Sequence, residues 1–299
     1  MSEASLKKSC VCKRKCAPSR FLALNILIVT TIPNFIYGTA WKKEATTHLV
    51  ELALASGFRA IDTANQAKHY SEALVGEALL TVAKNGISRD QLWLQSKFTS
   101  PDGQDHRLPY DPSADIATQV EQSFASSLEH LHTNYLDSYL LHGPYNNPLL
   151  GAEDFEVWKA LEKIYHRGAT KMIGISNVNL QQLEMLVAHA EVKPMFVQNR
   201  CYADRNWDAG VRNFCNKHGI FYQGFSLLTA NPQIVRGTTV TTLAKKYHIE
   251  SEQIIFRFCQ QLDMIPLTGT SNEQHMKADL NISNFELLDE EIESITNLS

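Results

Sequence analysis

Four polar side chains in the first half of the chain have the types and spacing for a proton transfer: Asp62, Tyr70, Lys97 and His142. A phenol has a pKa of about 10, so it is a weak acid at neutral pH unless a nearby cation lowers that pKa. Lys97 can supply this cation to Tyr70, and Asp62 can hold Lys97 in place. His142 can donate a second hydrogen bond to the same reacting oxygen. Together these groups suit carbonyl reduction, in which a nicotinamide delivers hydride to the carbon and the tyrosine protonates the oxygen.

These residues need a fold that brings separate segments together. Eight short runs of β-branched, aromatic and other apolar residues predict strands at 35–40, 58–62, 92–97, 135–142, 171–176, 195–199, 221–226 and 264–269. Apolar residues at helical spacing fill segments between them, including 44–57, 116–131, 155–168 and 180–190. Strands that alternate with helices lie parallel, and eight such units close into a barrel of about 250 residues. We therefore predict an α/β fold, a single-domain (β/α)8 TIM barrel with a short extra N-terminal tail.

An open, doubly wound sheet is the alternative fold. Such a sheet usually carries G-x-G-x-x-G after its first strand, whereas the first predicted strand here continues as "YGTAWKKE". In a barrel, the loops after the strands build the active face. Asp62, Lys97 and His142 end three successive predicted strands. The barrel therefore places all three at one mouth.

Composition limits the classes of protein that the chain could be. Its 299 residues are 44% apolar and carry a net charge of −4, which fits a folded protein and disfavours bulk nucleic-acid binding. Cys201, Cys215 and Cys259 show neither zinc spacing nor a disulfide framework, so we expect reduced thiols, no metal and a cytoplasmic location.

The amino-terminal segment 1–32 is basic and contains three cysteines followed by the apolar run "FLALNILIV" (21–29). This order fits a basic tail that runs into the first strand, a secretory signal, or lipidation beside the basic cluster. The run is shorter than the ~20 residues that span a bilayer, so no stable membrane insertion is expected. Targeting or membrane association through residues 1–30 stays open. The barrel is expected at 33–299.

Several motifs in the body of the chain resemble those of the aldo-keto reductases. They are "GFRAIDTA", "SKFT", "YLLHGP", "GISNVN", "FVQN", "GFSLL" and "LTGTSNEQHMKADL", and their order and approximate spacing match over about residues 33–298. That family folds as a (β/α)8 barrel and binds NADP(H) across the carboxyl face of the barrel. The resemblance implies a proton-relay tetrad made of Asp62, Tyr70, Lys97 and His142.

The resemblance also implies a cofactor site. Ser176, Asn177 and Gln198 match positions that hold the carboxamide of the nicotinamide. Phe225 matches the ring that stacks under the nicotinamide, and Ser226 a residue that grips the pyrophosphate. The remaining matched cofactor positions are Leu228, Gly269, Thr270, His275 and Asp279. For the substrate, we expect contacts from Trp41 and His142 at the mouth of the barrel.

Two departures from the family pattern concern the acid and the cofactor phosphate. The usual tyrosine position is Ala67, so assigning the acid to Tyr70 assumes three extra loop residues; the following "SEALVGEAL" favours this assignment. Gly269 and His275 occupy positions where the family commonly has a lysine and an arginine for the 2′-phosphate, and Lys277 could compensate. We therefore expect NADP(H), with NAD(H) as an alternative.

A third departure concerns the walls of the pocket. The chain has an extra loop at 99–113 and a short segment after "FELLDEEIESI", which predicts an open pocket shaped by Trp41, the 99–113 loop and "GPYNNPLL" (143–150). We expect NADP(H)-dependent reduction of a small aldehyde or ketone by a monomer or weak oligomer. A cofactor-binding, slowly turning-over regulatory subunit, like the potassium-channel β-subunits that resemble this family, is the alternative.

Overall fold

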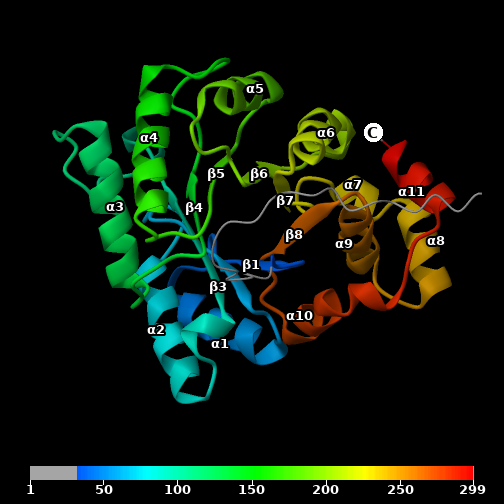
Figure 1. Ribbon diagram of the computed structural model, residues 1–299. Helices are drawn as coiled ribbons and strands as arrows, with labels where there is room; N and C mark the ends of the chain where they lie inside the picture. The colour runs from blue at the N-terminus through cyan, green and yellow to red at the C-terminus, as the bar shows by residue number, and fades with distance from the viewer. Residues whose placement is uncertain (1–31, 299) are drawn as a thin grey trace, which may run out of the picture. The chain divides into compact units, whose positions relative to one another are not determined.

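The computed structural model describes residues 32–298, in which eight parallel strands close into a barrel in chain order (Figure 1). The strands are β1 (Ile36–Gly38), β2 (Ala60–Asp62), β3 (Trp93–Phe98), β4 (Ser138–Leu141), β5 (Ile173–Ser176), β6 (Phe196–Arg200), β7 (Phe221–Phe225) and β8 (Met264–Thr268). Strand β8 pairs with β1 and closes the barrel. Each observed strand overlaps one of the eight predicted strands. The (β/α)8 prediction is confirmed, and the open sheet is excluded.

Helices surround the barrel and cover its outer surface (Figure 1). They are α1 (Thr46–Ser56), α2 (Glu72–Lys84), α3 (Ile116–His130), α4 (Ala152–His166), α5 (Leu180–His189), α6 (Ala209–His218), α7 (Pro232–Val235), α8 (Thr238–Tyr247), α9 (Ser251–Gln261), α10 (Glu273–Leu280) and α11 (Asp289–Thr296). Short 3-10 turns occur at η1 (Lys43–Ala45), η2 (Arg89–Gln91), η3 (Pro101–Gly103), η4 (Ala203–Asp208) and η5 (Ile282–Asn284). No helix within residues 32–298 is long and apolar enough to cross a membrane.

Side chains at the ends of helices explain several of these boundaries. Helix α3 begins after Asp115, whose carboxylate accepts a hydrogen bond from the Thr118 amide at 2.8 Å. Asn179 caps α5 in the same way through the Gln182 amide at 2.9 Å. Helix α1 ends at Gly57, which has φ of 120°, a conformation that favours glycine.

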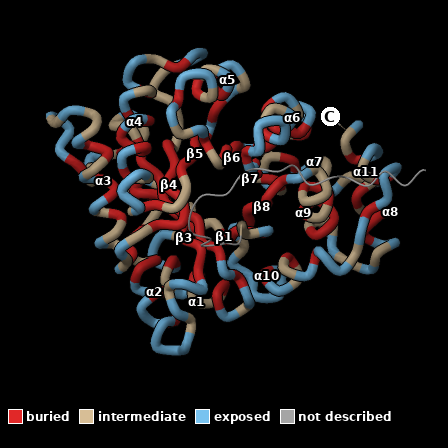
Figure 2. The backbone as a smooth tube through the Cα atoms, in the orientation of Figure 1, coloured by how far each residue is buried: buried red, intermediate tan, exposed pale blue. Residues whose placement is uncertain are grey.

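The apolar core has two parts, one outside and one inside the barrel. Figure 2 shows the central strands buried and the outer faces of the helices exposed. The outer part joins strands to helices, and it includes Trp158 of α4 together with Ile173 and Ile175 of β5. A smaller cluster packs inside the barrel and comprises Ile36, Ala60, Trp93, Leu140, Phe196, Ile265 and Leu267. This interior cluster supports a polar layer that lies further along the strands.

The predicted tail, residues 1–32, lies outside the described residues apart from Ile32, so its targeting and lipidation alternatives keep the status of predictions. The three described cysteines are free and buried. No group of three or more metal-ligating side chains occurs in the range 32–298.

Candidate active site

Asp62 and Lys97 form a buried ion pair inside the barrel. The Lys97 Nζ atom lies 2.7 Å from each carboxylate oxygen of Asp62 and 2.8 Å from the carbonyl oxygen of Thr63. These three acceptors use all three donors of the ammonium. Burial lowers the pKa of Lys97, and the charge of Asp62 opposes that shift. The pair is therefore locked between β2 and β3.

A layer of amides supports the Asp62 carboxylate. Gln95 faces the interior like Lys97, because residues two apart on a strand point to the same side. Its Nε2 donates to Asp62 Oδ1 at 2.7 Å and to Gln223 Oε1 on β7 at 2.8 Å. Gln223 Nε2 donates back to Gln95 Oε1 at 3.0 Å. A buried carboxylate needs such donors, and the reciprocal pair with Gln223 holds the Gln95 amide in place to donate to Asp62.

The same layer fixes the orientation of Gln198. Gln198 Nε2 donates to Asp62 Oδ1 at 3.0 Å and to Gln223 Oε1 at 2.9 Å. Both partners are acceptors, so the amide nitrogen must point toward them. Gln198 also lines the cleft described below, and its Oε1 is therefore the atom left to accept a hydrogen bond there.

Tyr70 lies beside the Asp62–Lys97 ion pair, but its hydroxyl has no hydrogen-bond partner among residues 32–298. The Lys97 ammonium lies 5.3 Å from the centroid of the Tyr70 ring, and the Tyr70 and His142 rings meet edge to face at 5.9 Å. Burial, and secondarily the charge of Asp62, raises the pKa of Tyr70 above its ordinary value. Burial dominates this shift, so the predicted lowering of the Tyr70 pKa by Lys97 does not occur in this arrangement.

His142 follows β4 and lies beside Tyr70. Its Nδ1 lies 2.7 Å from the Thr99 hydroxyl. Burial, with a further contribution from the charge of Lys97, lowers the pKa of His142 well below its ordinary value. The imidazole is therefore neutral at pH 7, and its Nε2 is left for a group in the cleft.

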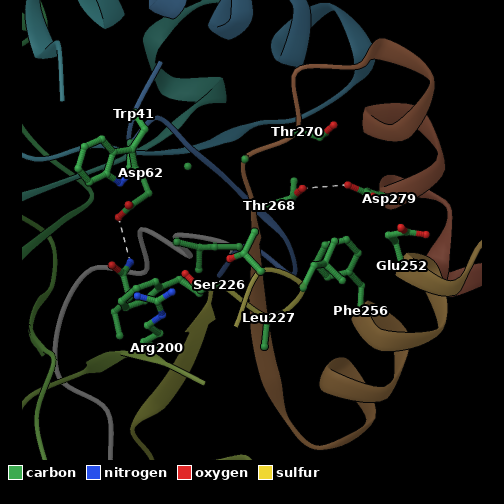
Figure 3. A pocket seen from close by; sticks show the side chains of 18 of the residues that line it. Trp41, Asp62, Arg200, Ser226, Leu227, Glu252, Phe256, Thr268, Thr270 and Asp279 are labelled. Carbon is green, nitrogen blue, oxygen red and sulfur yellow. Dashed lines mark hydrogen bonds between the residues drawn. The ribbon is translucent and has the colours of Figure 1, made fainter. Parts of the chain in front are cut away.

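A cleft of about 730 Å³ opens above these residues at the carboxyl ends of the strands (Figure 3). Asp62, Tyr70, His142 and Trp41 line it, whereas Lys97 lies beneath the surface of the cleft. All ten predicted cofactor residues also line it: Ser176, Asn177, Gln198, Phe225, Ser226, Leu228, Gly269, Thr270, His275 and Asp279. The lining thus includes residues from the carboxyl ends of seven strands, and Lys97 of the remaining strand, β3, lies beneath it.

The end of the cleft near His142 has the groups that a carboxamide would need. Ser176 Oγ donates to the Gln198 carbonyl at 2.6 Å, and Asn177 Nδ2 donates to the His142 carbonyl at 2.8 Å. Asn177 Nδ2 also donates to Ser176 Oγ at 3.2 Å, which occupies its second hydrogen. The amide oxygens of Asn177 and Gln198 are left as acceptors for an NH₂ group. This end therefore fits the carboxamide of a nicotinamide.

Comparison with known proteins identifies the family. The family model described as "Aldo/keto reductase family" matches residues 35–231. The chain belongs to the aldo/keto reductase family. A glyoxal reductase of Bacillus subtilis (strain 168) is 30% identical over 255 residues, which cover 85% of this chain and 83% of the relative.

Two further relatives of this aldo/keto reductase extend the comparison. An NADPH-dependent alpha-keto amide reductase of Saccharomyces cerevisiae is 29% identical over 280 residues, covering 87% of this chain and 84% of the relative. The crystal structure of an aldo/keto reductase from Brucella melitensis has a TM-score of 0.75 and 27% identity, and the match covers 90% of this chain and 95% of that chain. The family and the fold therefore agree with the resemblance seen in the motifs.

Sequence reasoning missed several residues that line the cleft of this aldo/keto reductase. Lys42 and Arg200 each lie within two residues of the end of a predicted strand, so strand position alone could have indicated them. Glu250, Glu252 and Phe256 come from α9 or the residue before it. No sequence signal marked these three, because α9 lies in the long connection between β7 and β8 and carries no family motif quoted above.

The walls of the cleft differ in part from the prediction. Trp41 lines the mouth, is 67% exposed, and packs against His69 with ring centroids 4.0 Å apart. Neither the 99–113 loop nor residues 143–150 line this cleft. The 99–113 loop instead packs against the segment that follows β2. Gln66 Nε2 donates to the Gly103 carbonyl at 2.7 Å, and Gln104 Nε2 donates to the Asn65 carbonyl at 2.8 Å.

Proposed function

We propose that this aldo/keto reductase reduces a small aldehyde or ketone to the alcohol, with NADP(H) or NAD(H) as cofactor and Tyr70 as the general acid. The observation that carries the proposal is the buried Asp62–Lys97 pair beneath Tyr70 and His142. All ten predicted cofactor residues line the cleft into which Tyr70 and His142 face. Two relatives are named for reductions of glyoxal and of alpha-keto amides, which supports small carbonyl substrates.

A bound reduced nicotinamide cofactor supplies the hydride for the carbonyl carbon. The Tyr70 hydroxyl, which has no hydrogen-bond partner in the described part of the chain, and His142 Nε2 bind the carbonyl oxygen. The raised pKa of Tyr70 keeps the phenol protonated until the oxygen gains negative charge. His142 is neutral, so it orients the oxygen with a hydrogen bond and leaves the proton transfer to Tyr70.

Lys97 acts when Tyr70 loses its proton. The phenolate carries a negative charge close to the ammonium, and one of the Lys97 hydrogens can turn from Asp62 or Thr63 toward it. This charge stabilisation appears only as the proton leaves, so it lowers the barrier of the chemical step. Asp62 holds the lysine in the barrel until then.

Gln198, Asn177 and Ser176 would hold the carboxamide of the nicotinamide. The amide layer keeps the Gln198 oxygen directed toward the cleft. Phe225, which is partly exposed on the wall, offers a face against which an aromatic ring can stack.

A cofactor-binding regulatory subunit with slow turnover is the second candidate function. The observation that favours it is the raised pKa of Tyr70 together with the full engagement of Lys97 by Asp62 and Thr63. A poor acid slows proton transfer.

Steady-state reduction of a panel of small aldehydes and ketones separates the two functions. The reductase proposal predicts saturable loss of reduced-nicotinamide absorbance that depends on the aldehyde and on Tyr70. Tight cofactor binding with no substrate-dependent turnover across the panel would instead support the regulatory subunit.

A further inference from the structure

The far end of the cleft, away from Asp62, is acidic. Glu250, Glu252 and Asp279 line it, and Figure 3 shows Glu252 and Asp279 beside Phe256 and Thr268, apart from Asp62 and Arg200. The Thr268 hydroxyl donates to Asp279 Oδ2 at 3.0 Å. Burial, with a smaller contribution from the charge of Glu252, raises the pKa of Asp279 to about 7, although the Thr268 hydrogen bond opposes the shift. Glu252 and Asp279 are therefore close enough to repel each other.

At the start of the helix at this end, two backbone amides are already occupied by a side chain. Asn272 precedes α10, and its Oδ1 accepts from the amides of Gln274 at 2.8 Å and His275 at 3.1 Å. Anions bind helix starts through unsatisfied amides. Here the Asn272 side chain already occupies two of them, and Glu273 adds a negative charge to the same turn.

Acidic side chains occupy the start of α9 as well. Glu250 is its N-cap residue and Glu252 lies in its first turn. Negative side chains stabilise the positive end of a helix dipole, and they cancel the attraction of that end for a ligand phosphate.

The cations near this end do not balance the acids. Lys277, which could have compensated for the missing lysine and arginine, pairs with Glu273 at 2.6 Å and does not line the cleft. Lys42 does line the cleft, but its ammonium donates to the Gly269 carbonyl and burial lowers its pKa. His275 is the other basic group of the described chain at this end. A 2′-phosphate would bring a charge of about −1.5 to −2 into these surroundings.

We infer that this end of the cleft accepts an adenosine whose ribose hydroxyls are both free, so that the protein binds NAD(H) in preference to NADP(H). Carboxylates accept hydrogen bonds from a ribose 2′-hydroxyl, whereas a 2′-phosphate next to them meets like charge. The residues present thus fit the nicotinamide end of either cofactor but do not fit the 2′-phosphate. The inference rests on the proposed function and changes the cofactor that the family resemblance favoured.

Equilibrium binding to the full-length protein tests the inference. Isothermal titration measures the dissociation constants of NADH and NADPH, and those of 5′-AMP and 2′,5′-ADP as probes of the adenosine end. Each pair gives one ratio of affinities for the unphosphorylated and the phosphorylated compound. We expect the unphosphorylated member of each pair to bind more tightly by about tenfold, as for one charge-assisted hydrogen bond. NADPH binding as tightly as NADH, or more tightly, would overturn the inference and leave the reductase proposal standing.

Charge-neutral variants assign the preference to the carboxylates. Glu252→Gln should reduce the ratio of NADH affinity to NADPH affinity severalfold. Glu290 is an exposed glutamate on α11 outside the cleft, and Glu290→Gln should leave this affinity ratio unchanged. Glu250→Gln provides the same test if Glu252→Gln does not fold. An unchanged ratio in both cleft variants would refute the role of these acids. Binding of neither dinucleotide by the unsubstituted protein would refute this inference and the proposed function together.

Discussion

Lys97 gives two of its hydrogen bonds to Asp62, one to each carboxylate oxygen at 2.7 Å, and its third donor goes to the Thr63 carbonyl. The lysine therefore has no hydrogen left for Tyr70 until the charge on the phenol changes. Asp62 sets the position of Lys97, and the amides of Gln95 and Gln198 set the position of Asp62.

Tyr70→Phe should remove the acid and leave the cleft intact. We expect cofactor affinity to stay the same and single-turnover reduction to slow by ~10²–10⁴, the range for a lost general acid. Tyr135→Phe, which removes a phenol hydroxyl outside the cleft, is the matched control and should reduce substrate at the normal rate. Full activity in Tyr70→Phe would assign the acid to His142 or His69.

Lys97→Met should leave a buried carboxylate without its counter-ion. We expect the free energy of unfolding, measured in denaturant titrations, to fall by ~3–5 kcal/mol. The rate of carbonyl reduction should fall nearly as much as in Tyr70→Phe. Asp62→Asn keeps a donor-acceptor side chain at the same place, so it should reduce the rate less. A Lys97→Met protein that reduces substrate at the normal rate would show that Tyr70 needs no cation.

Gln95→Leu should weaken the site without touching substrate. It removes the donor to Asp62 and leaves the Gln223 Nε2 without an acceptor, which costs ~1–3 kcal/mol of stability. Gln223→Leu breaks the same amide pair but keeps the bond from Gln95 to Asp62. We therefore expect similar losses of stability but a larger fall in kcat for Gln95→Leu. Equal kcat values in the two variants would show that the bond to Asp62 does not position the relay.

Asp279 should make stability depend on pH. Its pKa rises from 3.8 in the unfolded chain to about 7 in the fold, so the native state holds its proton more tightly. The contribution of Asp279 to the free energy of unfolding is complete below pH 3.8 and is lost as the pH rises through about 7. Asp279→Asn should flatten this part of the stability profile in urea titrations. An unchanged profile in the variant would show that Asp279 titrates normally.

His275→Arg should restore a cation where the family resemblance expects one. NADPH binding should tighten by a fraction of the ~1.5–3 kcal/mol typical of a charged hydrogen bond, with little change for NADH. Gln274→Arg adds the same charge one residue away, outside the cleft lining, and serves as the control. Equal NADPH affinities in the two variants would place His275 away from the ribose 2′ position.

The barrel and most of the site could be predicted from the sequence, because both depend on local patterns. Alternating strands and helices are read from spacing within ten or so residues, and parallel strands in a closed barrel end at one mouth. For that reason strand position alone predicts that Asp62, Lys97 and His142 lie together. Tyr70 lies in a loop, and the motif after it was needed to select it over Ala67.

Only the tertiary structure decided how these groups are charged and paired. The pKa of Tyr70 depends on its burial and on its distance from the charge of Asp62, and neither is set by the local sequence. Gln95 and Gln223 are 128 residues apart, and only the closure and register of the barrel place their amides in contact. The acids of α9 face the cleft because that helix packs beside β8 and α10, so the charge at the adenosine end followed from packing rather than from any motif.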